Sequence, residues 1–211
     1  MGLRRRLFAL TYDRFMAGGE KAGLGAARAK LLADATGAVL EIGAGTGLNI
    51  AYYPRSVRDL TLAEPDTAML RLERAAARTS MPVTLLRAPA EDLPYEDGSF
   101  DTVVSTLVLC AVDDQPRAVR EIRRVLKPGG RLLFLEHLRS DDDRLARRQD
   151  RINWLSRLTT NCDCNRPTLR TVENGGFVVD DVRHGELPKS PSFVRPMIVG
   201  RALRSADVVT A

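Results

Sequence analysis

Residues 39–49 read VLEIGAGTGLN, a short apolar run that leads into three glycines at alternating positions. These glycines are Gly43, Gly45 and Gly47. Glycines in such a run occur where the backbone comes very close to a ligand, or turns where a Cβ atom would clash. The stretch therefore predicts a buried strand that ends in a tight turn beside a ligand.

The spacing of the glycines narrows the class of ligand. A dinucleotide fingerprint that starts at Gly43 needs a glycine at position 48, where the chain has Leu48. The phosphate-binding G-x-x-x-x-G-K-[ST] loop is also absent, because no lysine lies nearby. Instead, Glu41 precedes the glycines and Glu64 ends the next apolar run. A carboxylate at Glu64 can accept both hydroxyls of a ribose, so the pattern favours a nucleoside with a cationic tail over a pyrophosphate.

Strands and helices alternate along the chain that surrounds this loop. Strands are expected at 38–42, 59–63, 82–88, 100–105 and 131–137, and helices near 47, at 66–79 and at 115–126. The segment KPGG at 127–130 is expected to separate the last helix from the last strand. This alternation is typical of a doubly wound parallel sheet that binds ligands at the carboxyl ends of its strands.

The pattern changes on both sides of this core. Helices are expected at 3–16, 20–35, 141–158 and 167–174, and two late strands at 177–183 and 196–204 should form an antiparallel addition to the sheet. The 211 residues contain no internal repeat and are expected to form one domain. Its parts would be N-terminal helices or a lid at 1–36, a cofactor-binding core at 37–139, a substrate-side insertion at 140–175 and C-terminal strands at 176–211.

The composition is ordinary for a soluble globular protein, with 44% apolar and 28% charged residues. The net charge of +5 comes from arginines scattered among acids, which favours a mixed surface over nucleic-acid binding. The longest uncharged apolar run, near 107–112, is too short to span a membrane, and no secretory signal is visible. Three cysteines at no zinc-like spacing predict a reduced, cytoplasmic protein without a metal.

Four blocks of sequence together resemble one enzyme family. They read VLEIGAGTGLN at 39–49, TLAEPD at 61–66, APAEDLPYEDGSFDTVVSTLVL at 88–109 and EIRRVLKPGGRLLFLEH at 121–137. In order and spacing they resemble the class I S-adenosylmethionine-dependent methyltransferases of the type 11 branch. The resemblance implies a Rossmann-like seven-stranded sheet, six strands parallel and one antiparallel, with helices on both faces. It also implies S-adenosyl-L-methionine as methyl donor and S-adenosyl-L-homocysteine as product.

The resemblance further implies which residues hold the cofactor. The loop would line the methionine and ribose part, with Glu41 beneath it holding the loop or the amino group, and Glu64 would take the ribose hydroxyls. The segment after Glu64 would flank the adenine, the segment at 90–92 would contact its edge, and the end of the fourth strand would line the methyl side. The expected residues are Glu41, Gly43, Ala44, Gly45, Thr46, Gly47, Asn49, Glu64, Pro65, Asp66, Met69, Ala90, Glu91, Asp92, Thr106 and Leu107.

A narrower resemblance extends over about residues 12–202. The segments STLVLCAV at 105–112, NRPT at 165–168, ENGGF at 173–177 and VRPMIVGRA at 194–202 are similar to a methyltransferase-like group that contains membrane-associated alkyl-thiol S-methyltransferases. The animal enzymes begin with a hydrophobic anchor, whereas this sequence has LRRRLFAL. We therefore expect no transmembrane segment and at most weak contact with a membrane surface. Substrate or lid residues are expected at Tyr12, Phe15, Met16, Cys110, Trp154 and Arg166.

A thiol acceptor makes few demands on the protein. A thiol with a pKa of about 8.5 is already partly ionised near neutrality, so alignment and exclusion of water can carry much of the rate. If a general base is used, His137 is the first candidate because it ends the fifth strand, and Asp163 is a second. Cys110 is expected to be a buried small side chain.

Three alternatives remain open at this point. The acceptor atom could be oxygen, nitrogen or carbon in a natural-product, quinone-like or lipid molecule. The chain could also bind the cofactor without catalysis, as a scaffold. The oligomeric state could be a monomer or a homodimer.

Overall fold

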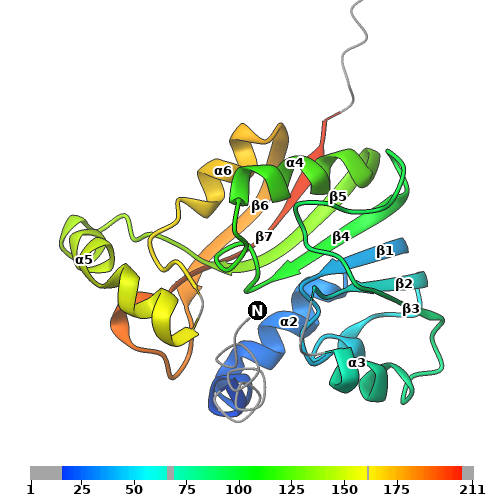
Figure 1. Cartoon of the computed structure of the whole chain (residues 1–211), viewed down its shortest axis with the longest axis horizontal. Coiled ribbons are helices and arrows are strands. Elements are labelled where there is room, and N and C mark those ends of the chain that lie inside the picture. The colour runs from blue at the N-terminus through cyan, green and yellow to red at the C-terminus, as the bar shows by residue number, and fades with distance from the viewer. Residues whose placement is uncertain (1–15, 66–68, 161, 206–211) are drawn as a thin grey trace, which may run out of the picture.

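The computed structural model describes residues 16–65, 69–160 and 162–205 of the chain. The expectations for Tyr12, Phe15 and Asp66, and for the side chain of Met69, lie outside the described residues. One sheet has the strand order β3-β2-β1-β4-β5-β7-β6 (Figure 1). Its strands are β1 (Gly37–Ile42), β2 (Val57–Ala63), β3 (Val83–Leu86), β4 (Phe100–Thr106), β5 (Leu126–His137), β6 (Phe177–Glu186) and β7 (Pro196–Arg204).

The pairing confirms the expected sheet. Strands β1 to β5 pair in parallel, while β7 runs antiparallel to both of its neighbours, β5 and β6. Six strands therefore share one direction and one opposes them. The chain order reverses between β1 and β4, which are adjacent in the sheet. The carboxyl edge at such a switch point is where open α/β sheets bind ligands.

Helices cover both faces of the sheet (Figure 1). The helical elements are η1 (Glu20–Leu24), α2 (Gly25–Leu32), η2 (Ile50–Tyr52), α3 (Met69–Ala76), α4 (Gln115–Val125), α5 (Asp143–Thr160), α6 (Thr168–Asn174) and η3 (Ser192–Val194). Within the described ranges, no helix combines the length and the apolar character that a membrane crossing requires.

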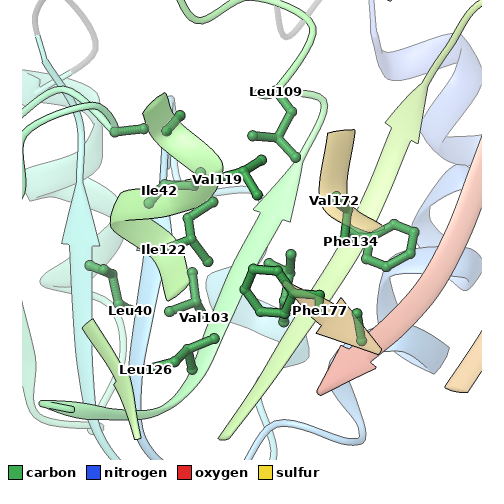
Figure 2. Close-up of a cluster of buried hydrophobic side chains, with 14 of the residues drawn as sticks. Leu40, Ile42, Val103, Leu109, Val119, Ile122, Leu126, Phe134, Val172 and Phe177 are labelled. Carbon is green, nitrogen blue, oxygen red and sulfur yellow. The ribbon is translucent and has the colours of Figure 1, made fainter. Parts of the chain in front are cut away.

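The two faces are separate hydrophobic clusters because successive strand residues point to opposite sides. Val103 belongs to the cluster under α4 and α6, whereas its neighbour Val104 belongs to the cluster under α2 and α3. Figure 2 shows the first cluster, where Val119 and Ile122 of α4 lie against the sheet and Phe134 of β5 lies near α6. Burial on both faces explains why the core strands read as continuous apolar runs.

Three expectations about local structure were wrong. The helix expected after the glycine loop is only the short 3₁₀ turn η2, since the side chain of Asn49 is held by the core and Pro54 follows. The helix expected at 20–35 is a π-helical segment followed by α2, because Gly23 has a φ of 128° that interrupts regular α-helix. Strand β5 begins at Leu126, and residues 127–130 form an irregularity within it rather than a separate turn.

Candidate active site

The glycine loop at 43–47 leaves the carboxyl end of β1 in a left-handed backbone conformation. Gly43, Gly45 and Gly47 have φ angles of 55°, 57° and 82°. The loop is fixed at its start by a hydrogen bond from the amide of Ala44 to the carbonyl of Ala63 at the end of β2, 3.0 Å long. It therefore spans the ends of the two strands that would bracket a nucleoside.

The surroundings of the three glycines differ. A Cβ atom on Gly43 would meet Val108 at 2.6 Å, and one on Gly47 would meet Ala75 at 2.9 Å, so these two positions are filled by the protein itself. A Cβ on Gly45 would find no atom closer than 3.9 Å, and that atom is in the loop. The space next to Gly45 is thus open, which fits a loop that lets a ligand approach the backbone.

A carboxylate borders this open space. Oε2 of Glu64, directly after β2, accepts a hydrogen bond from the amide of Gly45 at 3.0 Å. The amide of Glu64 itself donates to the carbonyl of Leu86 in β3 at 2.9 Å, which fixes the backbone. Glu64 is half-buried and Pro65 beside it is exposed. The predicted ribose acceptor and the glycine loop are therefore in direct contact.

Glu41 lies beneath the loop in a buried polar network. Its Oε1 accepts from Nδ2 of Asn49 at 2.9 Å, and its Oε2 accepts from the hydroxyl of Tyr53 at 2.6 Å. Burial raises the pKa of Glu41 to about 7, although the hydrogen bonds from Tyr53 and Asn49 oppose the shift. This arrangement supports the prediction that Glu41 holds the loop, because Asn49 is tied to it directly.

The network continues into an arginine that no sequence pattern had singled out. Arg28 of α2 is 3% exposed, and its Nη1 donates to Oδ1 of Asn49 and to Oγ1 of Thr106, each at 2.9 Å. Its Nε pairs with Glu20 at 3.1 Å. One guanidinium thus joins the N-terminal helical region, the glycine loop and the end of β4. No motif or spacing in the segment around Arg28 indicates this role from the sequence.

The predicted adenine-edge segment lies in the loop before β4. Ala90 is buried, whereas Asp92 is exposed. Oε1 of Glu91 accepts from the amides of Asp113 and Asp114 at 2.8 and 3.1 Å. Glu91 therefore ties this loop to the residues that precede α4, and it holds the segment in place more directly than it offers a free carboxylate.

The end of β4 turns sharply. Leu107 has a φ of 60°, a conformation that non-glycine residues rarely adopt, and its amide donates to the carbonyl of Leu135 at 2.8 Å. The turn is held by the fully buried Glu136, whose Oε1 accepts from Ser105 Oγ and from the amides of Val108 and Leu109. Burial raises the pKa of Glu136. Strain in this turn is typical of functional positions, and Glu136, which sequence reasoning missed, fixes it.

Two cysteines and a histidine meet beyond this turn. Cys110, His137 and Cys162 are all buried, and their ligand atoms lie within 4.8 Å of one another. Nε2 of His137 and Sγ of Cys162 are 2.7 Å apart. His137 is therefore at the carboxyl edge as expected, beside Cys110. Cys162 was not among the expected site residues, and only the tertiary fold brings it here.

Asp163 is close to this edge but is already engaged. Its carboxylate accepts from Arg166 Nη2 at 2.6 Å and from Asn153 Nδ2 at 2.7 Å. Arg166 also donates to the carbonyl of Leu109 at 3.0 Å, so the pair connects the segment after α5 to the turn after β4. This geometry favours a positioning role for Asp163 over the predicted role as a base.

The two remaining residues expected at the substrate or lid, Met16 and Trp154, differ in burial. Met16 is buried in the cluster that includes Ala44 and the α2 residues. Trp154 on α5 is 66% exposed. Trp154 is the predicted substrate residue with the least support from the structure.

Comparison with known proteins points to one class of enzyme. The family described as Methyltransferase domain matches residues 40–134. The human protein named thiol S-methyltransferase TMT1B is 33% identical over 174 residues, which cover 79% of this chain and 70% of that protein. The ubiquinone/menaquinone biosynthesis C-methyltransferase UbiE of Idiomarina loihiensis is 39% identical over 104 residues, which cover 46% of this chain and 41% of that protein. A solved SAM-dependent methyltransferase of Thermotoga maritima, described as a possible histamine N-methyltransferase, has a TM-score of 0.69 at 25% identity and covers 97% of this chain and 100% of its own.

Proposed function

Because the chain belongs to the class I S-adenosylmethionine-dependent methyltransferases of the type 11 branch, we propose that it methylates the sulfur of a small apolar thiol. The chain is an enzyme of this family, its cofactor is S-adenosyl-L-methionine, and its acceptor is a small molecule. The similarity to proteins named thiol S-methyltransferases covers about four fifths of the chain and supports sulfur as the acceptor atom.

The observation that carries the thiol proposal is the state of the two candidate bases. Asp163 accepts hydrogen bonds from Arg166 and Asn153, and Nε2 of His137 contacts the Cys162 thiol. Methylation of oxygen, nitrogen or carbon usually requires a base to remove a proton, whereas a thiol ionises partly near neutrality. An acceptor side built from apolar residues and thiols therefore suits a thiol best.

The residues around the glycine loop fit the cofactor. The open space at Gly45 would admit the methionine and ribose part, and Glu64 would accept the ribose hydroxyls. Thr106 and Leu107 would face the methyl group at the end of β4. When bound, the cofactor supplies an electrophilic methyl group on a sulfonium. The protein aligns the acceptor with it, excludes water, and keeps the loop rigid through Glu41 and Asn49.

This proposal assigns a role to each part of the chain. Residues 37–139 would bind the cofactor, residues 1–36 and 140–175 would form the acceptor side, and residues 176–211 would complete the sheet of a single domain. All three cysteines are free thiols, which fits a reducing compartment such as the cytoplasm. Contact with a membrane surface remains part of the proposal only as a weak association.

Methylation of carbon in a quinone-like acceptor is the second candidate. It is supported by the 39% identity with UbiE of Idiomarina loihiensis, which extends over 104 residues. The TMT1B similarity extends further, over 174 residues. This difference favours the thiol.

The test is a mass measurement of products. The full chain is incubated with cofactor that carries a deuterated methyl group and with an alkyl thiol, a phenol, a quinol and an amine in separate reactions. We expect the heavy methyl group on the thiol, with little product from the other acceptors. Transfer to the phenol or quinol without transfer to the thiol would contradict the proposal. Failure to bind S-adenosyl-L-homocysteine in a calorimetric titration would contradict the cofactor site itself.

A further inference from the structure

The cluster of Cys110, His137 and Cys162 has the composition of a metal site. Two thiols and one imidazole are soft and borderline ligands, a set that prefers zinc among the common divalent ions. Three protein ligands are typical of a catalytic zinc, which keeps its fourth position for water or substrate. Four-coordinate structural sites, in contrast, use four protein ligands.

The distances fit a bound ion. A tetrahedral zinc with Zn–S bonds of about 2.3 Å and Zn–N bonds of about 2.0–2.1 Å holds its ligand atoms roughly 3.6–3.8 Å apart. In the structure these three atoms lie within 4.8 Å of one another, and Nε2 of His137 is 2.7 Å from Sγ of Cys162. Small side-chain adjustments would therefore place all three at bonding distance from one ion.

The charge balance of the cluster also fits, because all three ligand side chains are buried. Zn²⁺ with two thiolates and a neutral imidazole has no net charge, which a buried site tolerates. Nδ1 of His137 has no hydrogen-bond partner among the described residues, and Nε2 lies 2.7 Å from Sγ of Cys162. The imidazole is therefore not committed to another acceptor.

Backbone hydrogen bonds join the three segments that carry Cys110, His137 and Cys162. The amide of Asp163 donates to the carbonyl of Cys110 at 2.9 Å, which joins the Cys162 segment to the turn after β4. The amide of Arg139 donates to the carbonyl of Arg166, also at 2.9 Å, and joins the same segment to the end of β5. Such preorganisation is what a metal site requires of its ligands.

The cluster lies at the edge of the sheet that binds the cofactor. Cys110 is two residues from Val108, and a Cβ atom built on Gly43 would be 2.6 Å from the Val108 side chain. We propose that Cys110, His137 and Cys162 bind a zinc ion whose fourth position takes the acceptor thiol as a thiolate. The binding of the ion stands on the geometry of the cluster, whereas its role in activating the acceptor rests on the proposed thiol methylation.

The reaction balances with this assignment. The acceptor thiol binds the ion and releases its proton to water. A lone pair on its sulfur forms the bond to the methyl carbon, and the bond between that carbon and the sulfonium sulfur breaks, leaving its electron pair on the departing sulfur. The neutral thioether is a weak ligand and leaves the metal.

The first test uses Co²⁺ as a spectroscopic probe for the zinc site. The reduced full chain is treated with a chelator and titrated with Co²⁺. We expect one equivalent to bind, with a thiolate-to-cobalt charge-transfer band and the intense visible bands of tetrahedral cobalt. A small alkyl thiol should then change this spectrum. Absence of the charge-transfer band in the wild-type chain would overturn the proposal, and so would a Cys110–Cys162 disulfide that persists in the presence of a reductant.

Variants locate the ligands. Cys110→Ser and Cys162→Ser should each lose the charge-transfer intensity of one thiolate and bind Zn²⁺ at least about tenfold more weakly. Cys164→Ser is the matched control, because Cys164 is equally buried but its Sγ contacts Gln149 and Asn153 outside the cluster. Binding of S-adenosyl-L-homocysteine reports whether each variant is folded. An equal effect of all three substitutions would overturn the assignment. If one variant fails to fold, the wild-type cobalt spectrum and the other variant decide.

A last comparison separates this proposal from the proposed function. Cobalt or zinc bound at the cluster, with no methylated thiol, would leave the metal site standing and overturn thiol methylation. Conversely, a metal-free chain that methylates the thiol as fast as the zinc-loaded chain would overturn the activating role of the ion and leave thiol methylation intact.

Discussion

The hydroxyl of Tyr53 donates a 2.6 Å hydrogen bond to Oε2 of Glu41, and both side chains are buried beneath the glycine loop. Burial and the nearby Glu41 carboxylate also raise the pKa of Tyr53 well above its usual value, so the tyrosine remains a donor. The loop thus rests on a carboxyl group that is costly to ionise. The stability of the protein should depend on that cost.

Glu41→Gln should remove a pH-dependent loss of stability. The pKa of Glu41 is about 7 in the folded protein, compared with 4.5 for an ordinary glutamate, so the folded state keeps a proton that the unfolded chain loses. The contribution of Glu41 to the free energy of unfolding therefore falls as pH rises from about 4.5 to about 7, by at most about 3 kcal/mol. Urea unfolding at pH 5 and pH 8 measures this. Between pH 5 and pH 8, we expect the free energy of unfolding to fall more for the wild type than for the variant. If it changes equally with pH in both proteins, the raised pKa of Glu41 is contradicted.

Arg28→Met should strongly lower the free energy of unfolding, because the charged side chain of Arg28 is buried. The substitution leaves Oδ1 of Asn49 without the donor from Arg28, removes one of the two donors to Oγ1 of Thr106, and removes the partner of Glu20. The expected cost is about 3 kcal/mol in the free energy of unfolding. Arg58→Met is the matched control, because Arg58 is 68% exposed and its ion pair with Asp101 is worth less than about 1 kcal/mol. Equal midpoints of urea unfolding for the two variants would refute the role of Arg28.

Gly45→Ala should weaken cofactor binding by more than its backbone strain alone explains. Its φ of 57° costs an alanine about 1 kcal/mol, and the added methyl group enters the open space next to the loop. Gly129→Ala has a φ of 75° and no atom within 4 Å of the added carbon, so it carries the same strain away from the site. Calorimetry with S-adenosyl-L-homocysteine should show at least about tenfold weaker binding, about 1.4 kcal/mol, for Gly45→Ala alone. Unchanged affinity in both variants would place the ligand elsewhere.

Glu64→Gln should weaken cofactor binding and leave the fold intact. The amide oxygen can still accept from the Gly45 amide, but the charged acceptor for the ribose hydroxyls is gone. Hydrogen bonds to charged groups contribute about 1.5–3 kcal/mol, so the affinity should fall about 10- to 100-fold. Glu73→Gln, at an exposed position on α3, should have no effect. Both affinities are measured by calorimetry, and a loss of similar size in both variants would point to the net charge instead.

The core of the fold was predictable because its signals are local. Each parallel strand is a short apolar run bounded by turns or helices, and the glycines of 43–47 adopt the left-handed conformation that their pattern implied. Features that depend on competition between local and tertiary contacts were not predictable. The irregularity at 127–130 looks like a helix stop from sequence, but pairing of Leu126 with Phe100 extends β5 through it. Likewise, the anchoring of Asn49 leaves only a 3₁₀ turn where a helix was expected.

The residues of the candidate site also fall into two groups, those that the sequence predicts and those that only the tertiary structure identifies. Spacing in the sequence alone predicts the positions of residues in the glycine loop, such as Gly45, and at strand ends, such as Glu64 and His137. Cys162 joins His137 only because the chain after α5 returns to the sheet edge, and no spacing rule encodes that return. Arg28 and Glu136 are buried charges, and a sequence shows neither their burial nor their partners.

The position of β7 bears on how the protein is made. This strand separates β5 from β6 in the sheet, yet it is translated after both of them. During synthesis, β6 emerges before β7 and cannot join the sheet, because β7 is the strand with which it pairs. The hydrogen-bonding groups on this side of β5 also have no partner until residues 196–204 appear. An unpaired strand edge invites association with other chains, so the growing polypeptide should depend most on chaperones during that interval.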